Sequence, residues 1–183
     1  REDKYVLDID DYRSSLKFEL SEIAFPGREV VNFTKNWGSI CINLNKSKSF
    51  GKALRAKVKP AETLLEEIKT LSNAEKLYKI VDFIKAYLVW NGKMRNYRDS
   101  KYNKLFEAKE GNVGALNLLL INLCRKAGLS ADPILTKYRF DGILNTSFPS
   151  LTEINYVLGH VKIGETWLLV DATSPYHEPG NLP

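Results

Sequence analysis

The segment from Asn112 to Gly128 constrains the fold more than any other part of the chain. Leu116, Leu119 and Cys124 are among the apolar residues that line most of its helical circumference. This pattern predicts a helix over 112–127 that is buried on nearly every side and ends at Gly128. The chain has 183 residues, 44% of them apolar, which is enough to cover such a helix with a core of ordinary size.

Helices are predicted before this segment as well. Ser72 and Glu75 have the spacing of a capping box, in which a hydroxyl and a carboxylate satisfy the first N–H groups of a helix. The helix that they begin extends to about Val89. A second helix begins at Pro60, and residues 35–45 carry apolar side chains at helical spacing.

Alternation of polar and apolar residues predicts the strands. Residues 12–24 alternate in this way and end at Pro26 and Gly27, which predicts a strand followed by a turn. Three more strands are expected after the buried helix, at 132–139, 153–163 and 166–173, the last two joined by a tight turn at Gly164-Glu165. Helices, a central buried helix and then an antiparallel sheet make the predicted fold class α+β.

The charge and the cysteines exclude several kinds of site. The net charge is +5, but acidic residues are interleaved with the basic ones, so we expect a solvated mixed surface and no nucleic-acid partner. Cys41 and Cys124 lie in apolar surroundings, which predicts buried thiols and no disulfide framework. The spacing of cysteines and histidines suggests no metal site, and no cofactor is expected.

The sequence has no signal-peptide pattern and no run of 18 apolar residues, so we expect no transmembrane segment.

The stretch from about Ala74 to Pro183 resembles the transglutaminase-like superfamily, whose members share the papain-like Cys-His-Asp arrangement. The segments that carry the resemblance are Trp90-Asn91-Gly92, Ala108–Val113, Asn117–Leu120, Arg125–Leu129, Ile154–Val157 and Trp167–Thr173. It implies a core of helices and a buried helix packed on an antiparallel sheet at 61–183. Residues 1–60 would then be a strand and helix segment leading from a preceding domain, as in large bacterial exported proteins with flanking β-rich domains.

The resemblance assigns the three catalytic positions to Val113, Tyr156 and Asp171. Valine has no heteroatom and cannot replace a thiolate nucleophile. A phenol, with a pKa near 10, is a poor general base at neutral pH. No catalytic residue is therefore expected, and Asp171 is predicted to accept hydrogen bonds from the Tyr156 hydroxyl or from backbone N–H groups. Cys124 lies too far along the helix to replace the missing nucleophile.

A binding cleft is the remaining site that the resemblance implies. Its candidate residues are Trp90, Asn112, Asn117, Tyr156, His160 and Asp171. Tyr156 and His160 would both be diagonal neighbours of Asp171 on the sheet, so His160 is a second candidate partner for that carboxylate. The cleft would either hold a peptide or glycan strand or be filled by side chains.

Three functions follow from these observations. The first is a catalytically inactive transglutaminase-like domain that acts as a scaffold or recognition module of a bacterial envelope or exported protein, in the periplasm and beside flanking domains. The second is an active cysteine-type peptidase, amidase or transglutaminase that uses non-standard residues. The third is a polyanion-binding module, for which Lys93, Arg95 and Arg98 would supply the charge.

Overall fold

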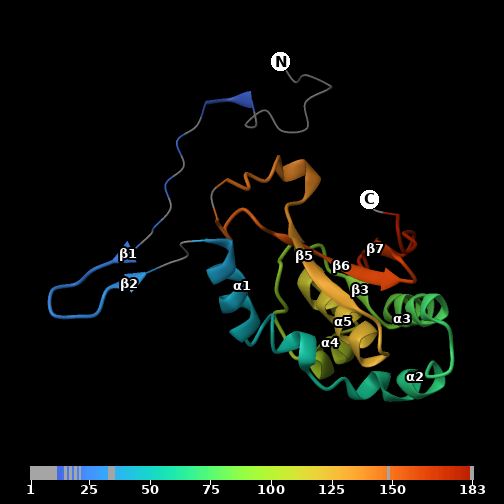
Figure 1. Cartoon of the computed structure of the whole chain (residues 1–183). Helices are drawn as coiled ribbons and strands as arrows, with labels where there is room; N and C mark the ends of the chain where they lie inside the picture. Colours follow the sequence, from blue (N-terminus) through green and yellow to red (C-terminus); the bar gives the residue numbers. More distant parts are fainter. Residues whose placement is uncertain are drawn as a thin grey trace.

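The structure, a computed structural model, describes residues 12–14, 16, 18, 20, 22–32, 36–147 and 149–181. Helix α5 lies at its centre, with the sheet β5–β7 on one side and the other helices around it (Figure 1). The described residues therefore have the predicted α+β class.

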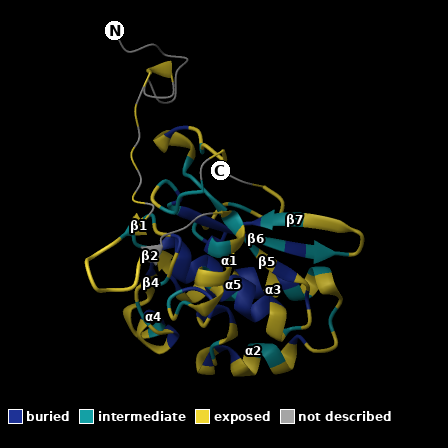
Figure 2. Cartoon of the chain, turned by 60° about the vertical axis from the view of Figure 1, so that its left-hand side comes forward, coloured by how far each residue is buried: buried dark blue, intermediate teal, exposed yellow. Residues whose placement is uncertain are grey.

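Helix α5 (Val113–Lys126) is as buried as its sequence predicts. All residues from Val113 to Cys124 are buried, and Figure 2 shows the helix as the dark centre of the molecule. Asn112 is its N-cap, because the Asn112 Oδ1 accepts a 2.7 Å hydrogen bond from the Ala115 N–H. At the other end Gly128 adopts a φ of 85°, which glycine tolerates best, and the helix ends there.

The sheet has three antiparallel strands in the order β5 (Ala131–Thr136), β6 (Tyr156–Ile163) and β7 (Thr166–Val170). Ile163 pairs with Thr166 across the predicted tight turn, where Gly164 has a φ of 60°. Gly159 allows the sheet to approach α5 closely, since a Cβ built there would lie 3.1 Å from a Leu120 methyl group. The three predicted strands are present, but residues 137–139, 153–155 and 171–173 lie outside them. The predicted register of β6 on β7 is confirmed.

The predicted helices before α5 are present. They are α1 (Trp37–Lys46), the short 3-10 helix η3 (Lys59–Ala61) with α2 (Glu62–Glu67), and α3 (Asn73–Tyr87). The Ser72–Glu75 capping box is confirmed, with the Ser72 N–H donating to Glu75 Oε2 at 2.9 Å. The sequence did not predict the 3-10 helices η2 (Ala53–Arg55) and η4 (Arg139–Asp141) or helix α4 (Tyr102–Ala108). It also did not predict the two-residue parallel pair β3 (Val89–Trp90) and β4 (Glu110–Gly111).

Residues ahead of position 61 contribute to the same core. Phe50, Ala53, Leu54 and Val58 are buried in the cluster that surrounds α5. The Asn122 Nδ2 of α5 donates to the Ala53 and Ala56 carbonyls at 2.8 and 3.0 Å. A domain boundary at residues 60 and 61 stays a prediction, but the segment just before it packs on α5.

The strand predicted over 12–24 is wrong for most of its described residues. Only β1 (Glu22–Ile23) is a strand there, paired with β2 (Val31–Asn32), and residues 15, 17, 19 and 21 lie outside the described residues. Leu16, Phe18 and Leu20 are highly exposed. A period-two pattern becomes a strand only where a neighbouring strand pairs with it, and Figures 1 and 2 show this segment standing away from the domain. The turn at Gly27, with a φ of 75°, is confirmed.

One cysteine prediction is wrong. Cys124 is buried, but Cys41 is exposed because it lies on the outer side of α1 while Ile40 beside it faces the core.

None of the helices in the described part of the chain is long and apolar enough to cross a membrane. Within that same part, no group of histidine, cysteine and carboxylate side chains could hold a metal ion.

Candidate functional site

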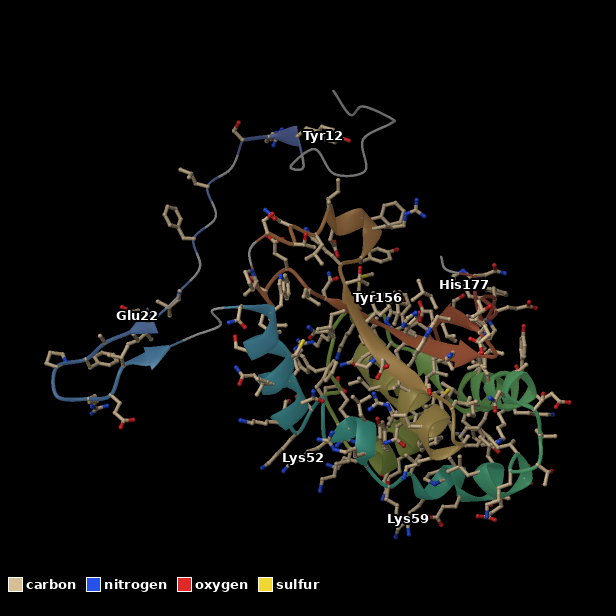
Figure 3. The ribbon with its side chains drawn as sticks, viewed as in Figure 1. Tyr12, Glu22, Lys52, Lys59, Tyr156 and His177 are labelled. Atoms are coloured by element: carbon tan, nitrogen blue, oxygen red, sulfur yellow. The ribbon has the colours of Figure 1, made fainter. Side chains whose placement is uncertain are left out.

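Three of the predicted site residues form one buried polar network. Asn117 lies in the second turn of α5, Tyr156 begins β6, and Asp171 follows the end of β7. The Tyr156 hydroxyl donates to Asp171 Oδ2 at 2.6 Å, and the Asn117 Nδ2 donates to Asp171 Oδ1 at 3.0 Å. All three side chains are buried, and Tyr156 lies within the domain in Figure 3. The predicted bond between Tyr156 and Asp171 is therefore confirmed.

Backbone groups complete this network. Asn117 also donates to the Val157 carbonyl at 2.9 Å, and its Oδ1 accepts from the Ala172 N–H at 2.8 Å. The Thr173 N–H donates to Asp171 Oδ1 at 2.9 Å. Asn117 thus joins α5 to the start of β6 and to the residues that follow β7, at the open end of the hairpin. This is a structural role for a polar residue in a mostly apolar helix.

The environment of Tyr156 opposes its ionisation. Burial raises the pKa of the phenol above its ordinary value. The neighbouring Asp171 carboxylate raises this pKa further, because its charge repels a phenolate and because it accepts a hydrogen bond that only the protonated phenol can donate. The Thr173 Oγ1 lies 2.9 Å from the hydroxyl and acts in the opposite direction. Tyr156 is consequently a neutral donor to Asp171 and cannot accept a proton at neutral pH.

The N-terminus of α5, where a nucleophile would be placed, is closed by backbone carbonyls. The Val113 N–H donates to the Lys93 carbonyl at 3.2 Å, and the Gly114 N–H donates to the Arg95 carbonyl at 2.8 Å. The next two N–H groups, of Ala115 and Leu116, donate to the side chain and the carbonyl of Asn112. The N–H groups of Val113, Gly114 and Ala115, which have no partner within the helix, are therefore all occupied, and the Leu116 N–H makes the first bond of the helix itself.

Gly114 is the residue that lets the 93–97 loop come this close. A Cβ at position 114 would lie 2.5 Å from the Tyr97 backbone nitrogen and 2.6 Å from its carbonyl carbon and oxygen, which is shorter than atoms tolerate. This contact was not predicted from the sequence. A glycine in the first turn of a helix is the signal that another backbone approaches there.

Trp90 supports the closing loop. It lies in β3, paired with Gly111 of β4, just ahead of the start of α5. Its indole Nε1 donates to the Lys93 carbonyl at 3.2 Å, the same oxygen that receives the Val113 N–H. Trp90 and Asn112 are thus both near Val113, as the resemblance implied, but as structural supports of the helix start.

His160 is not brought to Asp171. Its ring stacks on Trp167, with centroids 4.4 Å apart and planes 22° from parallel. The register places His160 diagonal to Asp171 on one side and to Trp167, nearer the hairpin turn, on the other. The imidazole contacts the indole, which offers the larger apolar surface. The interpretation of His160 as a partner of that carboxylate is wrong.

The one cysteine near the centre of the fold lacks the properties of a nucleophile. Cys124 lies at the far end of α5, fully buried, and burial raises the pKa of its thiol to about 12. A thiol in that state is almost wholly protonated at neutral pH. This agrees with the expectation that Cys124 does not replace the missing nucleophile.

Comparisons with known proteins give a likeness to solved structures alone. No family model matches the chain, and no curated protein matches it. Among solved structures, a crystal structure described as that of a TGase is similar over 84% of this chain and 36% of its own, with 15% identity and a TM-score of 0.45. The chain thus spans about a third of that structure. A likeness of this extent gives no support to any particular activity.

Proposed function

We propose that this chain is a transglutaminase-like domain without catalytic activity, and that it serves as a structural scaffold. The single observation that carries the proposal is the hydrogen bond from Tyr156 to Asp171. At the positions that the resemblance assigns to the histidine and the aspartate, a neutral phenol donates a hydrogen bond to the carboxylate. The bond ties the start of β6 to the end of β7, and Asn117 joins both to α5. Both carboxylate oxygens already accept hydrogen bonds from the protein, and neither position holds an imidazole to act as a general base.

The start of α5 supports the same conclusion. Acyl transfer by a cysteine enzyme needs a thiolate and N–H groups directed at the developing oxyanion. Val113 supplies no nucleophile and is fully buried, and the N–H groups of Val113 and Gly114 already donate to Lys93 and Arg95. These contacts favour a scaffold over a recognition cleft, because a peptide or glycan strand would have to displace the 93–97 loop.

In this proposal the domain belongs to a larger bacterial envelope or exported protein, where flanking domains are its partners. The motifs quoted for the resemblance support this context, and so does the N-terminal hairpin β1–β2, which extends away from the domain (Figure 1). The periplasm as the compartment and flanking domains as partners are proposed together with the scaffold function.

An assay of the unmodified chain tests the function. A glutamine-containing peptide is offered with a fluorescent primary amine, and both amine incorporation and ammonia release are followed. The proposal expects the chain and the Asp171→Asn variant to remain at the level of the blank. Turnover that Asp171→Asn abolishes, in a variant that circular dichroism shows to be folded, would overturn the proposal and favour an enzyme with non-standard residues.

A further inference from the structure

Positive charge is concentrated in two segments that the folded domain brings together. Residues 46–59 contain six lysines and arginines and no acidic residue, and residues 93–104 contain five with Asp99 as the one carboxylate. Eleven cations and one carboxylate give these segments a net charge of +10. Since the whole chain has +5, the remaining residues carry −5. Positive charge is therefore gathered in these two segments, although basic and acidic residues are interleaved over the rest of the sequence.

Direct contacts join the two segments into one surface, which we call the basic edge (residues 46–59 and 93–104). The Arg98 N–H donates to the Ser49 carbonyl at 3.1 Å, and the Arg98 guanidinium donates to the Lys48 carbonyl at 3.5 Å. The Tyr102 hydroxyl donates to the Ala53 carbonyl at 3.1 Å. Figure 3 shows Lys52 and Lys59 at the lower border of the domain.

The cations of the basic edge point into solvent. Ten of the eleven are exposed, and the exception, Arg98, is half-buried with its guanidinium over the Tyr102 ring, 4.7 Å from the centroid. Lys57 of the basic edge forms a 3.1 Å ion pair with Glu62, which lies just outside it. Like charges gathered in this way repel one another and destabilise the fold slightly, so an anionic partner would relieve the repulsion.

The shape of the basic edge favours a lipid surface over a nucleic acid. Single-stranded nucleic acids stack on several aromatic side chains, but Tyr97 is the one exposed large apolar residue in the two segments. Duplexes are read by a helix or ribbon in a groove, and the helical pieces here are short: three residues each in η2 and η3, and seven in α4. Lysine outnumbers arginine eight to three, and flexible lysine ammonium groups suit a diffuse anionic surface better than fixed forked contacts.

We infer that the basic edge binds the surface of a membrane that contains anionic lipids, through the phosphate groups of the lipid heads. The attraction is electrostatic and leaves the domain outside the hydrocarbon region, in keeping with the polar character of the two segments. The inference is independent of the proposed scaffold function, because none of the side chains in the polar network takes part. Each lysine or arginine near such a surface adds roughly fivefold to the affinity.

Vesicle co-sedimentation tests the inference. The chain is mixed with phosphatidylcholine vesicles that either contain or lack phosphatidylglycerol, and the bound fraction is measured at several salt concentrations. We expect binding only to the anionic vesicles and weaker binding as salt rises, because mobile ions screen the attraction. The triple variant Lys48→Gln, Lys52→Gln, Lys101→Gln should bind roughly 100-fold more weakly.

A matched variant controls for the loss of net charge alone. Lys69, Lys79 and Lys126 are exposed lysines outside the basic edge, and changing all three to glutamine removes the same charge. This control should bind anionic vesicles within about threefold of the unmodified chain, since its lost charges lie away from the lipid surface. An equal loss in both variants would overturn the assignment to the basic edge. Tight binding to a short DNA duplex, with no binding to anionic vesicles, would overturn the assignment to a membrane.

Discussion

Removal of one hydroxyl group from the polar network should destabilise the domain measurably. Tyr156→Phe keeps the ring, which lies 6.1 Å from the Tyr138 ring and nearly parallel to it. It deletes the hydroxyl that donates to Asp171 Oδ2 and also lies 2.9 Å from Thr173 Oγ1. A hydrogen bond to a charged group contributes about 1.5–3 kcal/mol, and Asp171 is only 2% exposed, so water cannot readily replace the lost donor. We therefore expect the free energy of unfolding to fall by about 2–3 kcal/mol.

Chemical and thermal unfolding measure this loss. For a chain of this length, a loss of that size lowers Tm by roughly 5–10 °C. Tyr138→Phe is the matched control, because it removes a phenolic hydroxyl from the stacked neighbour without touching Asp171, and it should change stability by less than about 0.5 kcal/mol. A double-mutant cycle with Asp171→Asn gives the coupling between the two groups. Equal effects of Tyr156→Phe and Tyr138→Phe, or a coupling near zero, would refute the structural role of the pair.

Three more predictions follow from the same contacts. Gly114→Ala should lower the free energy of unfolding by about 1–3 kcal/mol, because the added Cβ would lie 2.5 Å from the Tyr97 backbone nitrogen. This cost should outweigh the higher helix propensity of alanine. A gain in stability in urea unfolding would contradict the close approach. Burial raises the pKa of Tyr102 and Tyr156, so both phenols stay protonated in the folded state while the unfolded chain ionises near pH 10. The free energy of unfolding should therefore keep the full contribution of both phenols below about pH 10 and fall above it by about 1.4 kcal/mol per pH unit for each phenol. Tyr156→Phe should remove one of these two contributions from the measured slope. Finally, a disulfide-exchange reagent should modify Cys41 in the native protein and reach Cys124 only after unfolding, since burial raises the pKa of the Cys124 thiol to about 12; rapid modification of two thiols in native protein would exclude this arrangement.

Local signals explain the elements that were predicted correctly. The apolar circumference of α5, the Ser72–Glu75 capping box and the Gly164-Glu165 turn each depend on residues that are neighbours in sequence. Their chemistry fixes a helix or a hairpin before any distant contact forms. The bond between Tyr156 and Asp171 could also be predicted, because the hairpin register brings the two strands' residues to adjacent positions.

Features that depend on distant segments were missed. The closure of α5 by the Lys93 and Arg95 carbonyls needs a loop whose path is set by the packing of Trp90 and Gly114. The basic edge arises because Arg98 meets a segment about fifty residues earlier, which no local charge pattern reveals. The reverse error occurred at residues 12–24, where a clear alternation has no adjacent strand to pair with over most of its described length.

A thiol introduced at position 113 tests the central claim most directly. Val113→Cys in a Cys41→Ser background places sulfur at the start of α5 and removes the exposed thiol. Its rate of alkylation by iodoacetamide is measured against pH, in native and in unfolded protein. Because position 113 is fully buried and the surrounding N–H groups donate to Lys93 and Arg95, we expect alkylation only after unfolding. Fast alkylation of the native protein at neutral pH, with a thiol pKa below the ordinary value of about 8.5, would mean that an open and activating site survives there.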